Sequence, residues 1–162
     1  MEQEIIEIGA YKVDPTGDIV DEFDQLVRPV VHPSLSSFCQ ELTGIQQSEV
    51  NKADTFDYVF EQFYEWIDPA VHSSLVMSWG NKDFKLIKQE CTKANFDIAW
   101  LNYGDLKGAY RQMMGLPRSV GLARALKNEG IEFEGEMHNA LDDSYNLCLL
   151  FVKYLNQWAK YL

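Results

Sequence analysis

The sequence is poor in cysteine and has no long apolar run. Its 162 residues include three cysteines, Cys39, Cys91 and Cys148, each among apolar neighbours. An odd number at wide spacing argues against a disulfide framework or a zinc site. No run approaches the roughly 20 apolar residues of a membrane-spanning helix, and the N-terminus has neither a basic start nor a signal-type apolar stretch. We therefore expect a soluble, cytoplasmic protein that does not act at a membrane.

Positive charge is also scarce. The chain has 14 basic and 25 acidic residues, a formal net charge of −11. Proteins that hold nucleic acid by bulk electrostatics carry clustered Lys and Arg, so this charge argues against that class. It does not exclude a nuclease, because a carboxylate cluster that binds divalent cations is itself acidic. Lys82, Lys85 and Lys88 follow one expected helix, where they would contact phosphates or form a solvated face.

The length and the 46% apolar content predict one domain, residues 1–162, with a sizeable core. Alternation of apolar and polar residues and turn signals predict four strands, and three- to four-residue apolar spacing predicts helices between and after them. The expected strands are Glu4–Val13, Ile19–Val27, Leu75–Trp79 and Phe96–Leu101, the first two forming an antiparallel hairpin around Asp14–Gly17. The expected helices are Ser34–Leu42, Thr55–Ile67, Asn81–Ala94, Asp105–Met114, Ser119–Asn128 and Asn139–Tyr161. This order indicates an α/β domain, a sheet covered by helices.

The segment Met137–Asp143, at the start of the last expected helix, is the sharpest local motif. If His138 lies in the loop before the helix and Asp143 in its first turn, the two side chains can converge on one point. His titrates near neutral pH and can act as a general base, while Asp is a hard oxygen ligand for a metal. In the alternative, Asp142 and Asp143 only favour the helix N-terminus through the macrodipole, and His138 is exposed.

Asp83 occupies a second position of interest. It ends the segment Ser78–Asp83, in which an apolar strand stops at a glycine and an acid opens a helix. Sites in α/β folds gather at the carboxyl ends of strands, which favours a functional role. An Asp at a helix start is also a common cap, so the motif alone leaves both interpretations open.

Four segments together resemble the DEDDh family of 3′→5′ exonucleases, in the same order and approximate spacing. They read EIIEIGAYKV, RPVVHPSLSSFCQELTGI, SWGNKD and HNALDD. The second segment is long enough to argue against a chance match. The likeness is strongest to the subgroup of histone-messenger 3′ exonucleases, their RNA-interference relatives and sporulation inhibitors with an exonuclease domain. It implies a ribonuclease H-like mixed sheet flanked by helices.

The resemblance also implies a site. Asp83 and Asp143 would be metal-ligating acids, and His138 the general base. Phe38 and the stretch Leu42, Thr43, Gly44 and Ile45 would lie beside the terminal nucleotide; their alternative role is a helix stop plus core packing. The implied reaction is hydrolysis of phosphodiester bonds at the 3′ end of single-stranded RNA or DNA, with two Mg²⁺ or Mn²⁺ ions.

One part of the family pattern has no counterpart. The family's first motif, D-x-E, lies on a strand before EIIEIG, where this sequence has only Met1, Glu2 and Gln3. Glu2 and Glu4 form an E-x-E that is most simply a solvated strand start. The implied fold would then lack its first strand, which lies in the middle of the sheet between Glu4–Val13 and Leu75–Trp79. We therefore expect the chain to be N-terminally incomplete. The exposed gap in the sheet would also favour a homodimer. We expect an exonuclease whose activity is impaired, or else a non-catalytic module of the same fold that binds a nucleic-acid end or a protein.

Overall fold

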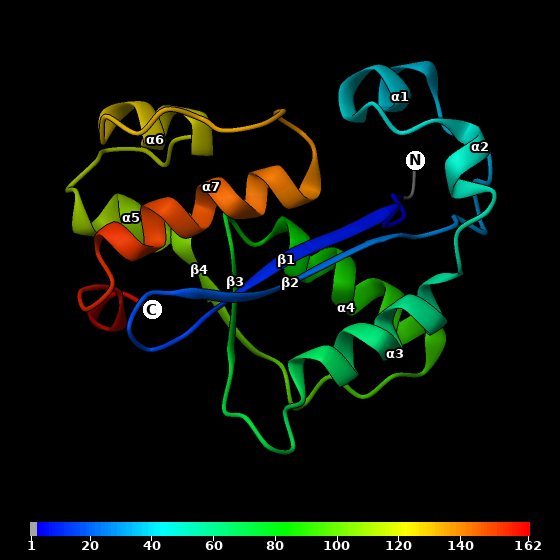
Figure 1. Cartoon of the computed structure of the whole chain (residues 1–162), viewed down its shortest axis with the longest axis horizontal. Coiled ribbons are helices and arrows are strands. Elements are labelled where there is room, and N and C mark those ends of the chain that lie inside the picture. The colour runs from blue at the N-terminus through cyan, green and yellow to red at the C-terminus, as the bar shows by residue number, and fades with distance from the viewer. Residues whose placement is uncertain (1–2) are drawn as a thin grey trace.

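The computed structural model describes residues 3–162, and it begins with an antiparallel hairpin. Strand β1 (Glu7–Val13) pairs with β2 (Ile19–Leu26), with Glu7 opposite Leu26 and a bulge between Lys12 and Val13. The turn between them is tied by the Asp14 side chain, which accepts bonds from the backbone N–H groups of Thr16 and Asp18. The hairpin thus forms where the sequence predicted it, and it crosses the centre of the molecule in Figure 1.

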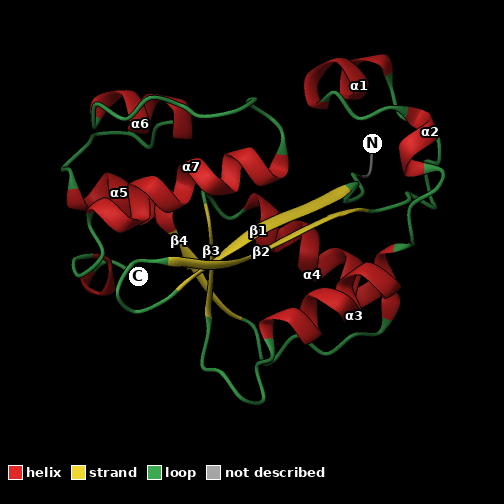
Figure 2. Ribbon diagram, viewed as in Figure 1, coloured by secondary structure: helices red, strands yellow, loops and turns green. Residues whose placement is uncertain are grey.

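A second strand pair is parallel and separate from the hairpin. Strand β3 (Leu75–Ser78) pairs with β4 (Asn102–Asp105) in a parallel register. Within residues 3–162 no strand joins β1 to β3, so the mixed sheet consists of two two-stranded pieces. Figure 2 shows the two pieces crossing at an angle between the helices.

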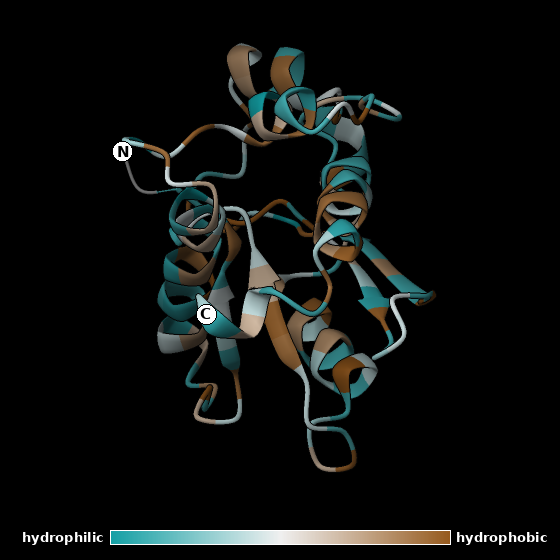
Figure 3. Cartoon of the chain, turned by 90° about the vertical axis from the view of Figure 1, so that its left-hand side faces the viewer, coloured by the Kyte–Doolittle hydropathy of each residue, from teal (hydrophilic) through white to brown (hydrophobic). Residues whose placement is uncertain are grey.

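Helices surround both strand pairs, and two hydrophobic clusters hold them. The helices are α1 (Ser37–Thr43), α2 (Gln47–Val50), α3 (Phe56–Ile67), α4 (Lys82–Ala94), α5 (Leu106–Met113), α6 (Leu122–Asn128) and α7 (Ala140–Lys153), with the short 3₁₀ turn η1 (Trp158–Lys160). One cluster joins β1 and β2 to α3 and Cys91 of α4, and the other joins α5, α6 and α7 to Trp158. Figure 3 shows that apolar and polar residues alternate in bands along the helices.

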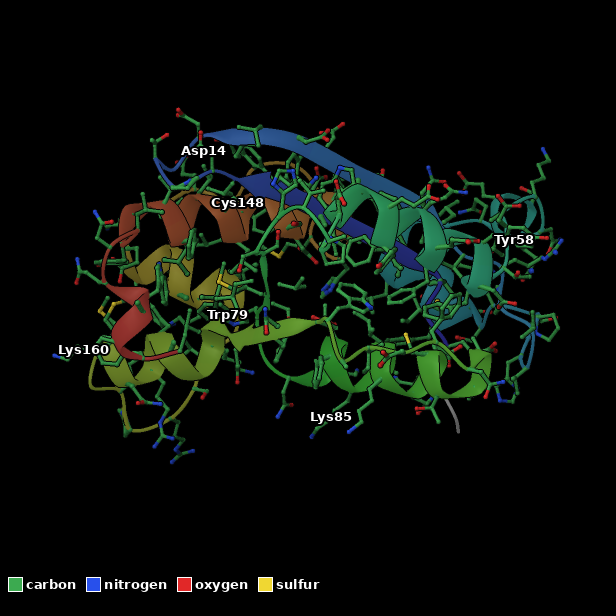
Figure 4. The ribbon with its side chains drawn as sticks, turned by 90° about the horizontal axis from the view of Figure 1, so that it is seen from below. Asp14, Tyr58, Trp79, Lys85, Cys148 and Lys160 are labelled. Atoms are coloured by element: carbon green, nitrogen blue, oxygen red, sulfur yellow. The ribbon has the colours of Figure 1, made fainter. Side chains whose placement is uncertain are left out.

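Apolar side chains of the two clusters point into the interior, and charged side chains such as Lys85 point toward solvent. In Figure 4, seen from below, Trp79 and Cys148 point into the body of the protein, whereas Lys85 projects outward from α4. Trp79 packs against the second cluster, and its indole N–H donates to the carbonyl of Val120. No helix among the described residues is long and apolar enough to cross a membrane.

Three sequence expectations are wrong in detail. Phe96–Leu101 is not a strand: it is a loop whose aromatic and apolar side chains pack against the first cluster, and the strand follows it at β4. The last helix ends at Lys153 rather than Tyr161, because the chain turns there to bury Trp158, whose indole N–H donates to the Phe151 carbonyl. Helix α2, with a capping box at Gln46, was not expected.

Candidate nuclease site

The loop before α7 brings His138 beside Asp143. Asn139 caps the helix by accepting a bond from the Asp142 N–H, and the His138 backbone N–H donates to Asp143 Oδ1 at 3.3 Å. His138 has a φ of 68°, a left-handed conformation that is uncommon for a residue with a side chain. Its side chain is exposed, while Asp143 is partly buried. His138 thus contacts Asp143 through its backbone N–H, and the convergence of the two side chains stays a prediction.

Two polar side chains of α7 fold this loop back onto the helix. Asp142 Oδ2 accepts from the Glu136 N–H at 2.9 Å, and a Cβ at Gly135 would lie 2.4 Å from Asp142 Cγ, so the loop approaches too closely for a side chain there. Asn146, fully buried, bonds both the N–H and the C=O of Glu134 and the C=O of Asp142. Sequence reasoning missed Asn146, although a polar residue one turn after Asp142 on the apolar side of a helix was a usable signal.

Strand β1 holds the start of α7 from the other side. Glu7 Oε2 accepts the Ala140 N–H at 3.3 Å, and a Cβ at Gly9 would lie 2.5 Å from the Leu141 nitrogen. Burial, together with the neighbouring charges of Asp24 and Asp143, raises the pKa of Glu7 to about 7, and the hydrogen bond from the Ala140 N–H partly offsets this. An acid in the middle of a branched apolar strand was the sequence signal for this contact, which was not predicted.

Asp83 is brought to the same region by the turn between β3 and α4. Gly80 has a φ of 97° and its N–H donates to Asp105 Oδ1 at 3.1 Å, so the chain reverses directly after β3 and Asp83 falls in the first turn of α4. Burial raises the pKa of Asp83, and a hydrogen bond from the Ser78 hydroxyl partly offsets this. The carboxylate is thus reached by solvent yet surrounded by protein.

Asp83, His138 and Asp143 line one cavity of about 2210 Å³. Burial raises the pKa of Asp143, the His138 N–H and charge lower it, and the charges of Asp142 and, least of all, Asp83 raise it. The three residues therefore lie around one cavity, with Asp83 in the first turn of α4 and Asp143 in the first turn of α7.

The donor set for a metal is incomplete in residues 3–162. No three His, Cys, Asp or Glu side chains in that range come close enough together to hold a metal ion. Glu4 is not a spare ligand, because its carboxylate accepts the N–H groups of Val30, Val31 and His32. Glu2, the other acid of the E-x-E pair, lies outside the described residues. Mg²⁺ prefers six oxygen ligands in octahedral geometry, and two carboxylates do not supply a closed set.

The cavity continues between the two strand pairs. Its lining includes all of β1 and β3, whose facing edges have no hydrogen-bonded strand partner within the described chain. Unpaired backbone groups on a strand edge favour pairing with another strand. The structure thus leaves a strand-lined cavity next to Asp83 and Asp143.

The candidate substrate residues, which lie in α1 and in the turn directly after it, divide into two groups. Phe38 and Leu42 are exposed apolar side chains, 70% and 41% accessible, so core packing is excluded for Phe38. Thr43, Gly44 and Ile45 form the helix stop: the Thr43 hydroxyl bonds the Cys39 carbonyl, Gly44 has a φ of 75°, and Ile45 is buried. Leu42, Thr43 and Ile45 line the cavity, whereas Phe38 and Gly44 do not.

Comparison with known proteins assigns a family. Residues 1–151 match the sequence profile described as Exonuclease. The chain is 33% identical over 174 residues to human ERI1 exoribonuclease 2, covering 91% of this chain and 25% of that protein. It is 32% identical over 164 residues to human 3′-5′ exoribonuclease 1, covering 94% and 46%, and 32% identical over 178 residues to the Drosophila melanogaster 3′-5′ exonuclease Snipper, covering 98% and 63%. It thus spans less than two thirds of the length of these relatives.

Solved structures agree with that assignment. A 3′-exonuclease solved in a study of 3′-end specific recognition of the histone mRNA stem-loop matches with a TM-score of 0.87 at 28% identity, over 94% of this chain and 72% of that one. The nuclease domain of 3′hExo, a DEDDh family member bound to rAMP, matches with a TM-score of 0.85 at 29% identity, over 94% and 80%. The ribonuclease H-like fold expected from the motifs is confirmed.

Proposed function

The chain belongs to the exonuclease family, and from that membership we propose that it acts on the 3′ end of single-stranded RNA. Its homologues are 3′-5′ exonucleases of the DEDDh family, hydrolases that depend on divalent metals. The observation that carries the proposal is that Asp83, His138 and Asp143 line one cavity, with the two carboxylates in the first turns of α4 and α7.

In the proposed site Asp83 and Asp143 are metal ligands and His138 is the general base that accepts a proton from the attacking water. Mg²⁺ or Mn²⁺ would be the metal, with two ions in an intact site. Leu42 and Thr43, at the edge of the cavity, would contact the terminal nucleotide, with Phe38 presenting an apolar surface beside it. Single-stranded DNA is a second candidate substrate. Cytoplasmic location and a homodimer stay predictions.

The incomplete donor set leads to a second part of the proposal, that residues 3–162 alone cut slowly. A strand lying between β1 and β3 would pair both open edges and could bring further carboxylates next to Asp83 and Asp143. We propose that such a strand, with a D-x-E sequence, completes the site. The same observation favours the alternative that the chain alone binds a 3′ end without cutting it.

The activity is tested with a 5′-labelled single-stranded RNA and Mg²⁺ or Mn²⁺. Stepwise shortening from the 3′ end, lost in His138→Ala and kept in His72→Ala, supports the enzyme. Binding without shortening supports the non-catalytic module. An RNA that is neither bound nor shortened contradicts both.

The missing strand is tested by adding a synthetic peptide to the chain. An apolar β-forming peptide with D-x-E should raise both thermal stability and the cutting rate, while its N-x-Q counterpart should raise stability alone. If neither peptide changes the melting temperature, the cavity does not accept a strand and the second part of the proposal is wrong.

A further inference from the structure

Helix α1 is held in place by few packing contacts. It buries none of its side chains, and within the described chain its backbone makes at most slight contact with other helices and strands. Figure 1 shows α1 and α2 standing apart from the remaining helices. The position of α1 relative to the Asp83 and Asp143 region therefore depends on the segments on its two sides, of which the one that follows is fixed by the buried Ile45.

The segment leading into α1, residues 29–36, begins at the buried Pro29 and is next held by Glu4. Glu4 Oε1 accepts the N–H groups of Val30 at 2.8 Å and Val31 at 3.0 Å, and Oε2 accepts the N–H of His32 at 2.7 Å. Hydrogen bonds from three consecutive amides to one carboxylate are charge-assisted and roughly twice as strong as neutral ones. The pKa of Glu4 is lowered by these three N–H groups, which outweigh its desolvation.

A second anchor lies closer to the helix. Gln47 of α2 accepts the Leu35 N–H at 2.7 Å and donates to the Pro33 carbonyl at 2.9 Å. Gln47 fixes the end of the segment to α2, which stands apart with α1. Glu4 is the anchor that connects the segment to the chain entering β1.

The same stretch of chain also positions the other half of the site. Three residues after Glu4, the Glu7 carboxylate accepts the Ala140 N–H at the start of α7, where Asp143 lies. Glu4 and Glu7 thus connect α1 and α7 to one short segment. Resting on the proposed function, we propose that Glu4 is a positioning residue that sets the location of the apolar α1 face, Phe38 and Leu42, relative to the carboxylates that act on the RNA 3′ end.

Glu4→Ala removes the anchor without opening a core cavity, because the amides it releases are in exposed residues. The expected result is weaker binding of a linear single-stranded RNA with a free 3′ end, by about fivefold from lost preorganisation. Binding of a circular RNA of the same sequence should be unchanged. Fluorescence anisotropy measures both, and Glu65→Ala, which removes an exposed acid from α3, is the matched control for charge.

Hydrogen exchange at the amides of residues 30–32 keeps this test separate from the proposed function. These amides should be protected in the wild-type chain and exchange faster in Glu4→Ala, whether or not RNA binds. Unprotected wild-type amides would overturn the anchor. Faster exchange with unchanged linear-RNA affinity, or an equal loss for linear and circular RNA, would overturn the positioning role; a wild-type chain that binds no RNA at all would refute the proposed function instead.

Discussion

Replacing Glu7 by glutamine should stabilise the chain above neutral pH. The Glu7 carboxyl is partly buried between β2 and the start of α7, and it faces Asp24 and Asp143 as well as the Ala140 N–H. Glutamine has nearly the same shape, and its carbonyl oxygen can still accept the Ala140 N–H. The substitution therefore removes the buried negative charge while leaving the contact between β1 and α7 in place.

The direction of the pH dependence follows from the raised pKa. The folded chain binds the Glu7 proton up to a pH of about 7, whereas the unfolded chain releases it near 4.5. Raising the pH through this window lowers the stability of the wild-type chain, because the folded state holds more protons than the unfolded state. The full difference corresponds to about 3 kcal/mol at 1.36 kcal/mol per pKa unit. Solvent reaches part of the side chain, so about 1–2 kcal/mol is expected.

Urea unfolding of the wild-type chain and Glu7→Gln at pH 4.5 and pH 8 measures this effect. The two proteins should be nearly equal at the lower pH, and the variant should be more stable at the higher pH. Glu65→Gln, an exposed acid on α3, controls for the general loss of one negative charge. An equal difference at both pH values, or a less stable variant at pH 8, would refute the electrostatic explanation.

Three further substitutions test packing around α7. Gly9→Ala places a Cβ 2.5 Å from the Leu141 nitrogen, so it should cost about 1–3 kcal/mol of stability by overpacking; an unchanged urea midpoint would contradict the close approach. Asn146→Ala leaves the Glu134 N–H and C=O unpaired, and should cost about 2–3 kcal/mol and speed hydrogen exchange at the Glu134 amide. Leu150→Ala at a fully buried position should cost about 2–5 kcal/mol, and a loss below 1 kcal/mol would mean that the second cluster is loosely packed.

The parts of the fold that could be predicted are those whose own residues determine them. The expected helix at Thr55–Ile67 is observed at Phe56–Ile67, because its apolar residues recur at helical intervals. The strand at Asn102–Asp105 could not be predicted, since Asn, Gly and Asp disfavour strands and only parallel pairing with β3 makes it one. The apolar run before it looked like a strand because its buried side chains serve the core from a loop.

The candidate site shows the same division. His138 and Asp143 are five residues apart, so a single local motif identifies both. Asp83 was identified from its position directly after a predicted strand. Glu7 and Asn146 were missed because their hydrogen-bond partners lie on other elements and cannot be read from spacing. The roles of Asp83, His138 and Asp143 stay predictions until the variants are measured.

The separation of the two hydrophobic clusters bears on how the chain unfolds. The first cluster joins the hairpin to α3 and α4, the second joins α5, α6 and α7, and no buried residue among residues 3–162 belongs to both. Weakly connected parts of a domain open as distinct cooperative units, but here β1 of the first half packs closely against α7 of the second. Cooperative melting of the two halves therefore depends on this contact, and a strand inserted between β1 and β3 would give the halves a further connection.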